Sequence, residues 1–214
     1  MSMKKLVMSA LQMDEEIVLP PDYVECYYLR SDGKCYIPTQ YSGDDIIVET
    51  VLIAEKHSST YMVPFGAYGD YLGFALFHYS DIGWSLSKAD GKNFSFQPYE
   101  RVQVKTKFST SELYIECWMN NTLDGVYQQY HKRTASKLQQ NYGFNLFSPR
   151  AGVGADAFVG YMERTKIYDF SGNLIADYIP VLRIGGTPGF YDNVGGKFWQ
   201  NRGSGQLGYQ LKTQ

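Results

Sequence analysis

The chain has 214 residues, of which 20 are basic and 22 acidic, so that its net charge is -2. This balance gives no basic footprint for binding a nucleic-acid backbone or an anionic membrane, and the basic stretch 131–133 is interpreted as a solvated loop. No apolar run reaches the 18 residues of a membrane span, which argues against membrane insertion. Aromatic residues make up 16% of the chain, including 19 Tyr, and with 21 Gly they favour short strands joined by tight turns. The length fits one all-β domain of sandwich size.

The first 18 residues differ in composition from the rest. Apolar side chains recur there at helical spacing, at Leu6, Ala10, Met13 and Ile17, so that either a short amphipathic helix or an extended arm is compatible with the pattern. The apolar stretch is too short for a signal-peptide core, which indicates synthesis and folding in a cytoplasm. We therefore expect an arm, residues 1–18, that docks onto a neighbouring subunit or partner, followed by a domain, residues 19–214.

The three cysteines, Cys26, Cys35 and Cys117, cannot all pair within one chain. If Asp32-Gly33 forms the turn of a first hairpin, Cys26 lies opposite Thr39 and misses Cys35 by several residues. We expect all three to be reduced. Their spacing also matches no zinc-site pattern.

Three segments in the middle of the chain have strand patterns. Residues 46–53 are apolar on both faces at their ends, which predicts a central strand covered on both sides. Residues 72–76 and 82–86 alternate around a turn near Ser80-Asp81 and predict a hairpin.

The clearest alternation lies in residues 101–108 and 112–119. One face of each strand is mainly apolar, and these faces predict the core side of two neighbouring strands: Val102, Val104, Thr106 and Phe108 in the first, and Leu113, Ile115, Cys117 and Met119 in the second. The other faces carry basic residues opposite acidic and aromatic ones, namely Arg101, Gln103, Lys105 and Lys107 against Glu112, Tyr114, Glu116 and Trp118.

Two more hairpins are predicted near the C-terminus. Ser171-Gly172-Asn173 separates the apolar runs 166–170 and 174–179, and Gly and Asn adopt the positive φ that a tight turn requires. Gly195-Gly196 similarly separates Phe190-Tyr191 from Phe198-Trp199. Long helical patterns are absent, so two packed antiparallel sheets are the natural assembly.

The two ends of the chain resemble a known family. The opening Leu19-Pro20-Pro21-Asp22-Tyr23, the strand motif S-x-G-x-x-Y-I-x-T and the closing motifs K-I-Y-D, D-Y-I-P, G-x-Y-D, G-K-F and N-x-G-S-G carry the resemblance. They are similar to the laminin-G-like, concanavalin A-like lectin/glucanase domain of bacteriophage virion proteins and gut-bacterial surface proteins. Residues 40–160 match only in strand rhythm and in Phe65-Gly66-Ala67, so no binding site of the central loops is transferred. The resemblance implies an all-β, antiparallel two-sheet jelly-roll sandwich with a short N-terminal arm.

The same resemblance implies a function and a setting. It favours a non-enzymatic structural protein of a phage virion, a tail, fibre or capsid-decoration component made in the host cytoplasm. The arm would contact other virion proteins, the domain would bind host-surface carbohydrate, and the chain would form a homo-oligomer. One alternative is a decoration or fibre subunit without affinity for sugar, and another is a polysaccharide-degrading glycosidase.

Two groups of residues are candidates for carbohydrate binding. Tyr114 and Trp118 lie roughly 13 Å apart on the non-core face of one strand, with Glu112 and Glu116 beside them, and could form a platform for a sugar. The alternatives are a solvent face with Lys/Glu pairs or a subunit interface. The second group gathers aromatic and hydrogen-bonding side chains near loop ends: Tyr71, Tyr79, Asp81 and Asn93.

Motifs for catalysis are missing. Glucanase relatives use an E-x-D-x-x-E strand motif, whereas the segment from Glu112 to Glu116 lacks the middle Asp and holds its acids roughly 13 Å apart. The histidines, His57, His78 and His131, fit no triad or metalloprotease pattern. No cofactor is expected. Calcium is the one alternative, although the Asp-Gly pairs at 32–33, 90–91 and 124–125 are explained as turns.

Overall fold

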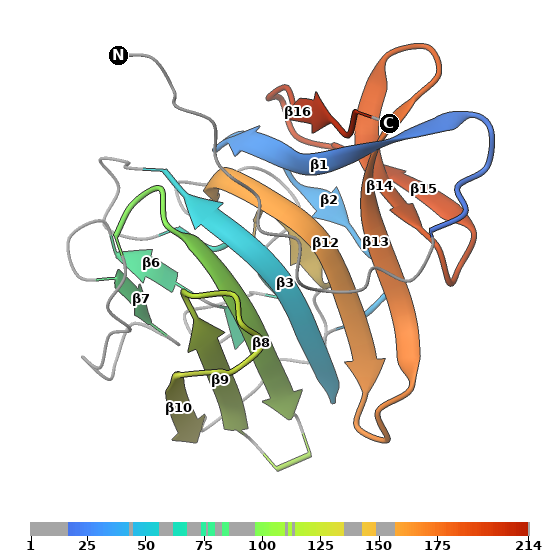
Figure 1. Ribbon diagram of the computed structural model, residues 1–214. Coiled ribbons are helices and arrows are strands. Elements are labelled where there is room, and N and C mark those ends of the chain that lie inside the picture. Colours follow the sequence, from blue (N-terminus) through green and yellow to red (C-terminus); the bar gives the residue numbers. More distant parts are fainter. Residues whose placement is uncertain are drawn as a thin grey trace.

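The computed structural model describes residues 17–42, 45–55, 62–67, 74–75, 77–79, 83–85, 97–109, 111–112, 114–134, 143–148 and 157–213. These residues form an antiparallel two-sheet jelly-roll sandwich, and they contain strands but no helix (Figure 1). The predicted all-β fold is therefore confirmed. Nearly all of the predicted arm, residues 1–16, lies outside the described residues. Within the described ranges, no helix has the length and apolar character needed to cross a membrane.

The first layer is a ten-stranded sheet. Its strand order is β10-β9-β8-β3-β12-β1-β13-β14-β15, and β16 pairs with β1. The C-terminal part of β1 pairs with the start of β12, and its N-terminal part pairs with the end of β13. The end of β12 and the start of β13 pair directly with each other. The strands are β1 Tyr23–Asp32, β3 Ile46–Ala54, β8 Arg101–Ser109, β9 Tyr114–Asn120, β10 Gln129–Thr134, β12 Val159–Asp169, β13 Leu174–Arg183, β14 Thr187–Asp192, β15 Lys197–Gln200 and β16 Gly208–Leu211.

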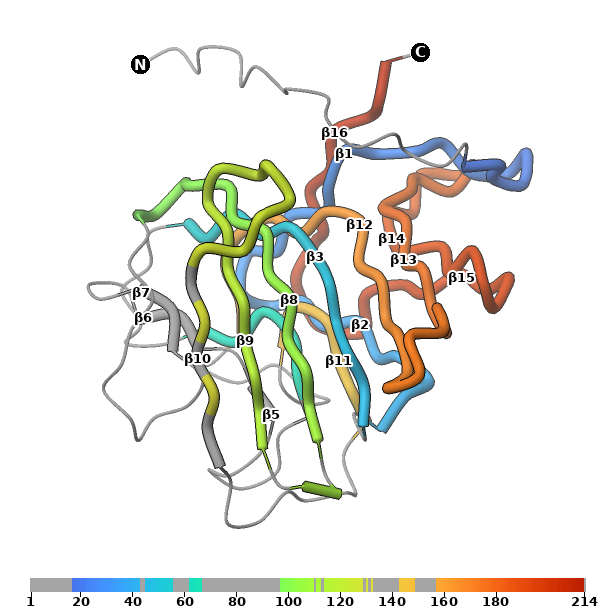
Figure 2. The backbone as a smooth tube through the Cα atoms, turned by 60° about the horizontal axis from the view of Figure 1, so that its bottom comes forward, coloured from blue at the N-terminus to red at the C-terminus, as the bar shows by residue number. Residues whose placement is uncertain are grey.

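The second layer is smaller and consists of β2 Ile37–Pro38, β11 Asn145–Leu146, β4 Phe65–Ala67 and β5 Phe74–Ala75 in that order. A separate pair is formed by β6 Phe77–Tyr79 and β7 Gly83–Ser85. In Figure 2, β2 is drawn on the side of the large sheet where β15 lies, and these two strands are in contact. Aromatic rings join the layers, since Phe65 of the small sheet packs edge-on against Phe108 of β8 at 6.3 Å. Both side chains are fully buried in the core.

The predicted central strands are confirmed. β3 lies between β8 and β12, and the core-facing residues of β8 and β9 that were predicted are buried wherever they are described. β3 is covered less than expected, because Ile47, Glu49 and Val51 on its outer face are only half-buried. The small sheet thus covers one face of the large sheet, and the other face carries the polar side chains.

The predicted C-terminal hairpins also form. β12 and β13 are joined by the turn at 171–173, where the amide of Asp169 donates to the carbonyl of Asn173 and Gly172 has a φ of 84°. β14 and β15 are joined around Gly195-Gly196. The hairpin expected between 72–76 and 82–86 is wrong in its first strand, because 74–75 form β5, which pairs with β4. The strand that pairs with β7 is β6, and the turn between β6 and β7 lies outside the described residues.

The predicted first hairpin at Asp32-Gly33 is wrong. β1 pairs with β12, β13 and β16, while β2 pairs with β11 in the other sheet. The Asp-Gly turn exists, with the Asp32 carboxylate accepting from the amide of Lys34, but it leads the chain across the sandwich. The crossing brings Cys35 and Ile37 into the core, where both are fully buried.

All three cysteines are buried free thiols, as predicted. Burial raises the pKa of Cys35 to about 11 and that of Cys117 to about 12. Their neutral forms therefore predominate at physiological pH, which fits a packing role.

Candidate functional site

The outer face of the large sheet carries an aromatic pair at its β9–β10 edge. Trp118 of β9 and Tyr130 of β10 are directly opposite in register, and their ring centroids lie 5.3 Å apart at an interplanar angle of 41°. Tyr130 is 54% exposed, and Trp118 is half-buried. Two neighbouring aromatic rings thus face solvent on a rigid sheet.

Charged groups adjoin this pair. The hydroxyl of Tyr130 donates to the carboxylate of Glu116 at 3.0 Å, and the ammonium of Lys132 lies 3.2 Å from the same carboxylate oxygen. Partial desolvation by neighbouring side chains, together with the hydrogen bond to Glu116, raises the pKa of the Tyr130 phenol, so the phenol stays neutral and remains a donor at physiological pH. We call the set of Glu116, Trp118, Tyr130 and Lys132 the Trp118 surface.

The strand period explains the Trp118 surface. Residues two apart point to the same face, so Glu116 and Trp118 share the outer face of β9 while Ile115, Cys117 and Met119 are buried on the other. In β10, Tyr130 and Lys132 are likewise two residues apart and share the outer face. The register then places Tyr130 beside Trp118 and Lys132 beside Glu116.

Tyr114 occupies a different environment from the one expected. It lies on the outer side of β9, but only 5% of it is exposed, because the ammonium groups of Lys132 and Lys107 lie 3.9 Å and 5.3 Å from its ring centroid. An exposed platform of Tyr114 and Trp118 is therefore not formed, and Tyr130 supplies the second exposed ring. Glu112 lies in the turn before β9 and is exposed.

The described part of the structure does not show the second group of predicted residues close together. Tyr71, Asp81 and Asn93 lie outside the described residues, and Tyr79 is placed only by its backbone in β6.

Turn chemistry accounts for the described Asp-Gly pairs. The Asp124 carboxylate accepts from the amide of Val126 and from the side chain of Asn120, and these bonds lower its pKa. Across the described ranges, no group of three or more His, Cys, Asp and Glu side chains is arranged to hold a metal ion.

The sequence pattern missed Tyr130 and Lys132, because the basic stretch 131–133 was interpreted as a loop. It lies in β10, an edge strand that pairs with β9 over six residues. The available signal was the alternation of Tyr130 and Lys132 across His131, but one neighbouring pair of residues is a weak indication of a strand.

No family model matches the chain, and no curated protein is similar to it in sequence. Solved structures match in fold. A Bacteroides ovatus protein assigned provisionally to carbohydrate binding is 12% identical, with a TM-score of 0.55 over 89% of this chain. This chain spans 61% of that protein's length.

Two further matches are more distant. The extracellular region of zebrafish Gpr126/Adgrg6 is 12% identical, with a TM-score of 0.43 over 89% of this chain and 26% of that one. A heptameric pentraxin of Limulus polyphemus is 8% identical, with a TM-score of 0.33 over 68% and 74% of the two chains. At 12% identity, the likeness to the B. ovatus protein establishes the sandwich fold alone.

Proposed function

We propose that the protein is a non-enzymatic, lectin-like domain that binds carbohydrate at the Trp118 surface. The observation that carries this proposal is the exposed Trp118–Tyr130 pair with the Glu116 carboxylate at its side. Aromatic rings offer a rigid apolar face for the C–H surface of a sugar at low entropic cost. The carboxylate and the ammonium of Lys132 supply hydrogen bonds to hydroxyl groups next to that face.

The state of the strand acids supports binding over hydrolysis. A glycosidase uses two converging carboxyl groups, one of them held protonated by a raised pKa. Here Glu55, Glu163 and Asp177 instead each accept two hydrogen bonds from an arginine. Among the described carboxyl groups whose pKa is shifted, Glu55, Asp124 and Asp169, every shift is downward.

The fold comparison is consistent with the proposal, since the B. ovatus protein with the same sandwich is assigned provisionally to carbohydrate binding. The comparison bears on the fold, and the sugar site is argued from the side chains of this chain.

A glycan array tests the proposal. We expect selective binding by the wild-type protein and a loss of about tenfold or more in a Tyr130→Ala variant, because roughly half of the aromatic face is removed. Tyr209→Ala is the matched control, since Tyr209 is a comparably exposed tyrosine on β16, 43% exposed. A blank array from folded protein, or equal losses in the two variants, would contradict the proposal.

We further propose that the protein is a component of a phage virion, as its opening and closing motifs imply. In this setting the arm attaches the domain to other virion proteins. Its test is the composition of particles assembled with a chain that lacks residues 1–18. Exclusion of the domain from those particles would support attachment through the arm, and normal incorporation would refute it.

A further inference from the structure

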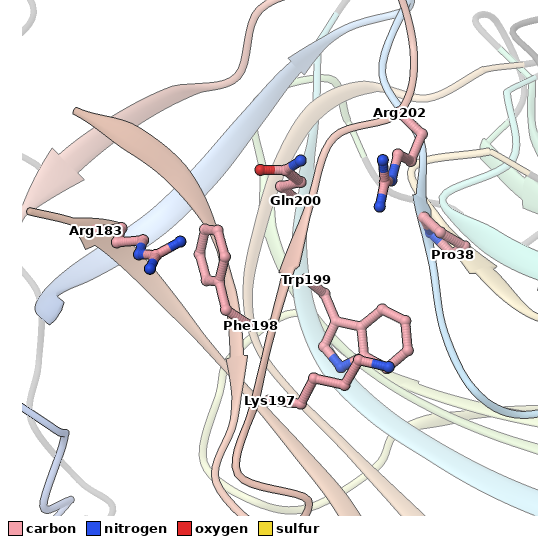
Figure 3. Close-up of a pocket in the computed structure, with 7 residues that line it drawn as sticks. All are labelled: Pro38, Arg183, Lys197, Phe198, Trp199, Gln200 and Arg202. Carbon is pink, nitrogen blue, oxygen red and sulfur yellow. The ribbon is translucent and has the colours of Figure 1, made fainter. Parts of the chain in front are cut away.

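A pocket of about 320 Å³ lies along the free edge of β15, far across the sheet from the Trp118 surface. β15 is the last strand in the order of the large sheet, and β2 of the other layer approaches it. Figure 3 shows the residues that line the pocket, which are Pro38, Arg183, Lys197, Phe198, Trp199, Gln200 and Arg202. Its volume is at the lower end of about 300 to 1,000 Å³ for small-molecule sites. We call it the β15 pocket.

Asn201 holds the wall of this pocket in place. Its side-chain oxygen accepts from the amide of Tyr36 at 3.0 Å, and its amide group donates to the carbonyl of Gly205 at 2.7 Å. The amide of Arg202 donates in turn to the carbonyl of Tyr36. These bonds tie the segment after β15 to the segment before β2, so the Arg202 backbone is fixed beside Pro38. The closing N-x-G-S-G motif thus builds one side of the pocket.

The lining is strongly basic. Arg183, Lys197 and Arg202 contribute three positive charges, and no acidic residue is among the lining residues. Arg183 and Lys197 lie against aromatic rings, at 5.9 Å from the centroid of Phe198 and 4.0 Å from the centroid of Trp199. Within the described part of the chain, no salt bridge engages any of the three. This contrasts with the outer sheet face, where arginines are held by carboxylates.

One of the lining residues, Trp199, also carries a hydrogen-bond donor without a partner. The indole nitrogen of Trp199 is buried and has no hydrogen-bond partner. A buried donor without a partner is destabilising, so it is usually satisfied by water, an ion or a ligand. In Figure 3 the Lys197 side chain lies across the indole.

We propose that the β15 pocket binds an acidic sugar residue, one that carries a carboxylate or sulfate group on its ring. Residues next to each other in a strand point to opposite faces, and Figure 3 shows Arg183 and Phe198 on one side of β15 and Trp199 on the other. Lys197 and Arg202 bind the oxyanion, and the indole of Trp199 packs against the sugar body. Binding of the sugar part rests on the proposed carbohydrate-binding function, whereas binding of the anionic group rests on the basic side chains of the pocket alone. A nucleic-acid strand fits less well, because it requires a basic groove that continues along several phosphates, whereas Lys197 and Arg202 line one small pocket.

The test uses two-dimensional NMR of ¹⁵N-labelled full-length protein, in which the three tryptophans give three indole signals that Trp→Phe variants assign. Glucuronic acid, glucose 6-sulfate, glucose and inorganic sulfate are titrated separately. We expect the Trp199 signal to shift with glucuronic acid or glucose 6-sulfate, and about tenfold less affinity for glucose. The Trp118 signal reports the proposed carbohydrate site independently.

Variants complete the test. Arg202→Gln and Lys197→Gln are expected to weaken binding of the acidic sugar about tenfold each, whereas Lys34→Gln, an exposed lysine outside the pocket, leaves it unchanged. Equal binding of glucose and glucuronic acid would overturn the anion site. Equal binding of inorganic sulfate and glucose 6-sulfate would overturn the sugar, as would tighter binding of a single-stranded oligonucleotide.

Discussion

At the scale of single residues, ion pairs with different burial have different consequences. Arg164 donates both arms of its guanidinium to Asp177 at 2.6 Å, and Asp177 is only 1% exposed. Removal of one partner from such a pair leaves a charge where water cannot replace the lost bonds. Lys132, by contrast, keeps 46% of its side chain exposed beside Glu116. Its ion pair is screened by solvent and contributes little to stability.

Asp177→Asn is therefore expected to lower the free energy of unfolding by about 3 kcal/mol, and Lys132→Gln by less than about 1 kcal/mol. Urea titrations followed by tryptophan fluorescence measure both. Losses of similar size would show that the burial of Asp177 does not determine the strength of its pair.

At the scale of elements, the centre of the large sheet depends on a glycine. Gly160 of β12 lies opposite Ala54 of β3 and Ser31 of β1, with a φ of 151°. A Cβ atom there would lie 2.3 Å from the backbone carbonyl oxygen of Ile53. Gly172 in the β12–β13 turn also has a positive φ, 84°, but a Cβ atom added to it would meet nothing within 4 Å. A comparison of alanine substitutions at the two glycines therefore distinguishes the cost of a steric clash from the cost of backbone strain.

Gly160→Ala is expected to destabilise the protein by more than about 3 kcal/mol, because the β3–β12 contact must open. Gly172→Ala is expected to cost only about 1 kcal/mol, the strain of a left-handed residue. Thermal unfolding followed by circular dichroism compares them, and a Gly160→Ala variant as stable as Gly172→Ala would refute the close packing of β3 on β12.

At the scale of the whole molecule, the sequence predicted which residues form strands better than it predicted which strands pair with each other. Local alternation identified β8, β9 and the C-terminal hairpins, since hydrophobic period and turn residues are read within a few positions. The first hairpin was wrong because Asp32-Gly33 fits a tight turn equally well when the next strand crosses to the other layer. Which strand pairs with β1 depends on burying Cys35 and Ile37, and no local signal contains that information.

The candidate site shows the same difference between predicting a strand and predicting its neighbour. Trp118 and Glu116 were found from the alternation in β9, whereas Tyr130 comes from β10 and adjoins Trp118 only through the pairing of the two strands. The burial of Tyr114 also depends on β10, because Lys132 covers its ring. Sequence therefore identified the face of the strand, and the neighbouring strand determined which rings on it are exposed.

The most direct test of carbohydrate binding at the Trp118 surface is the NMR signal of the Trp118 indole, followed while the glycan preferred on the array is added to the wild-type protein. The account predicts a saturable shift of that signal that is absent in Tyr130→Ala and retained in Tyr209→Ala. A bound glycan that leaves the Trp118 signal unmoved, or shifts it equally in the Tyr130→Ala variant, would contradict the account.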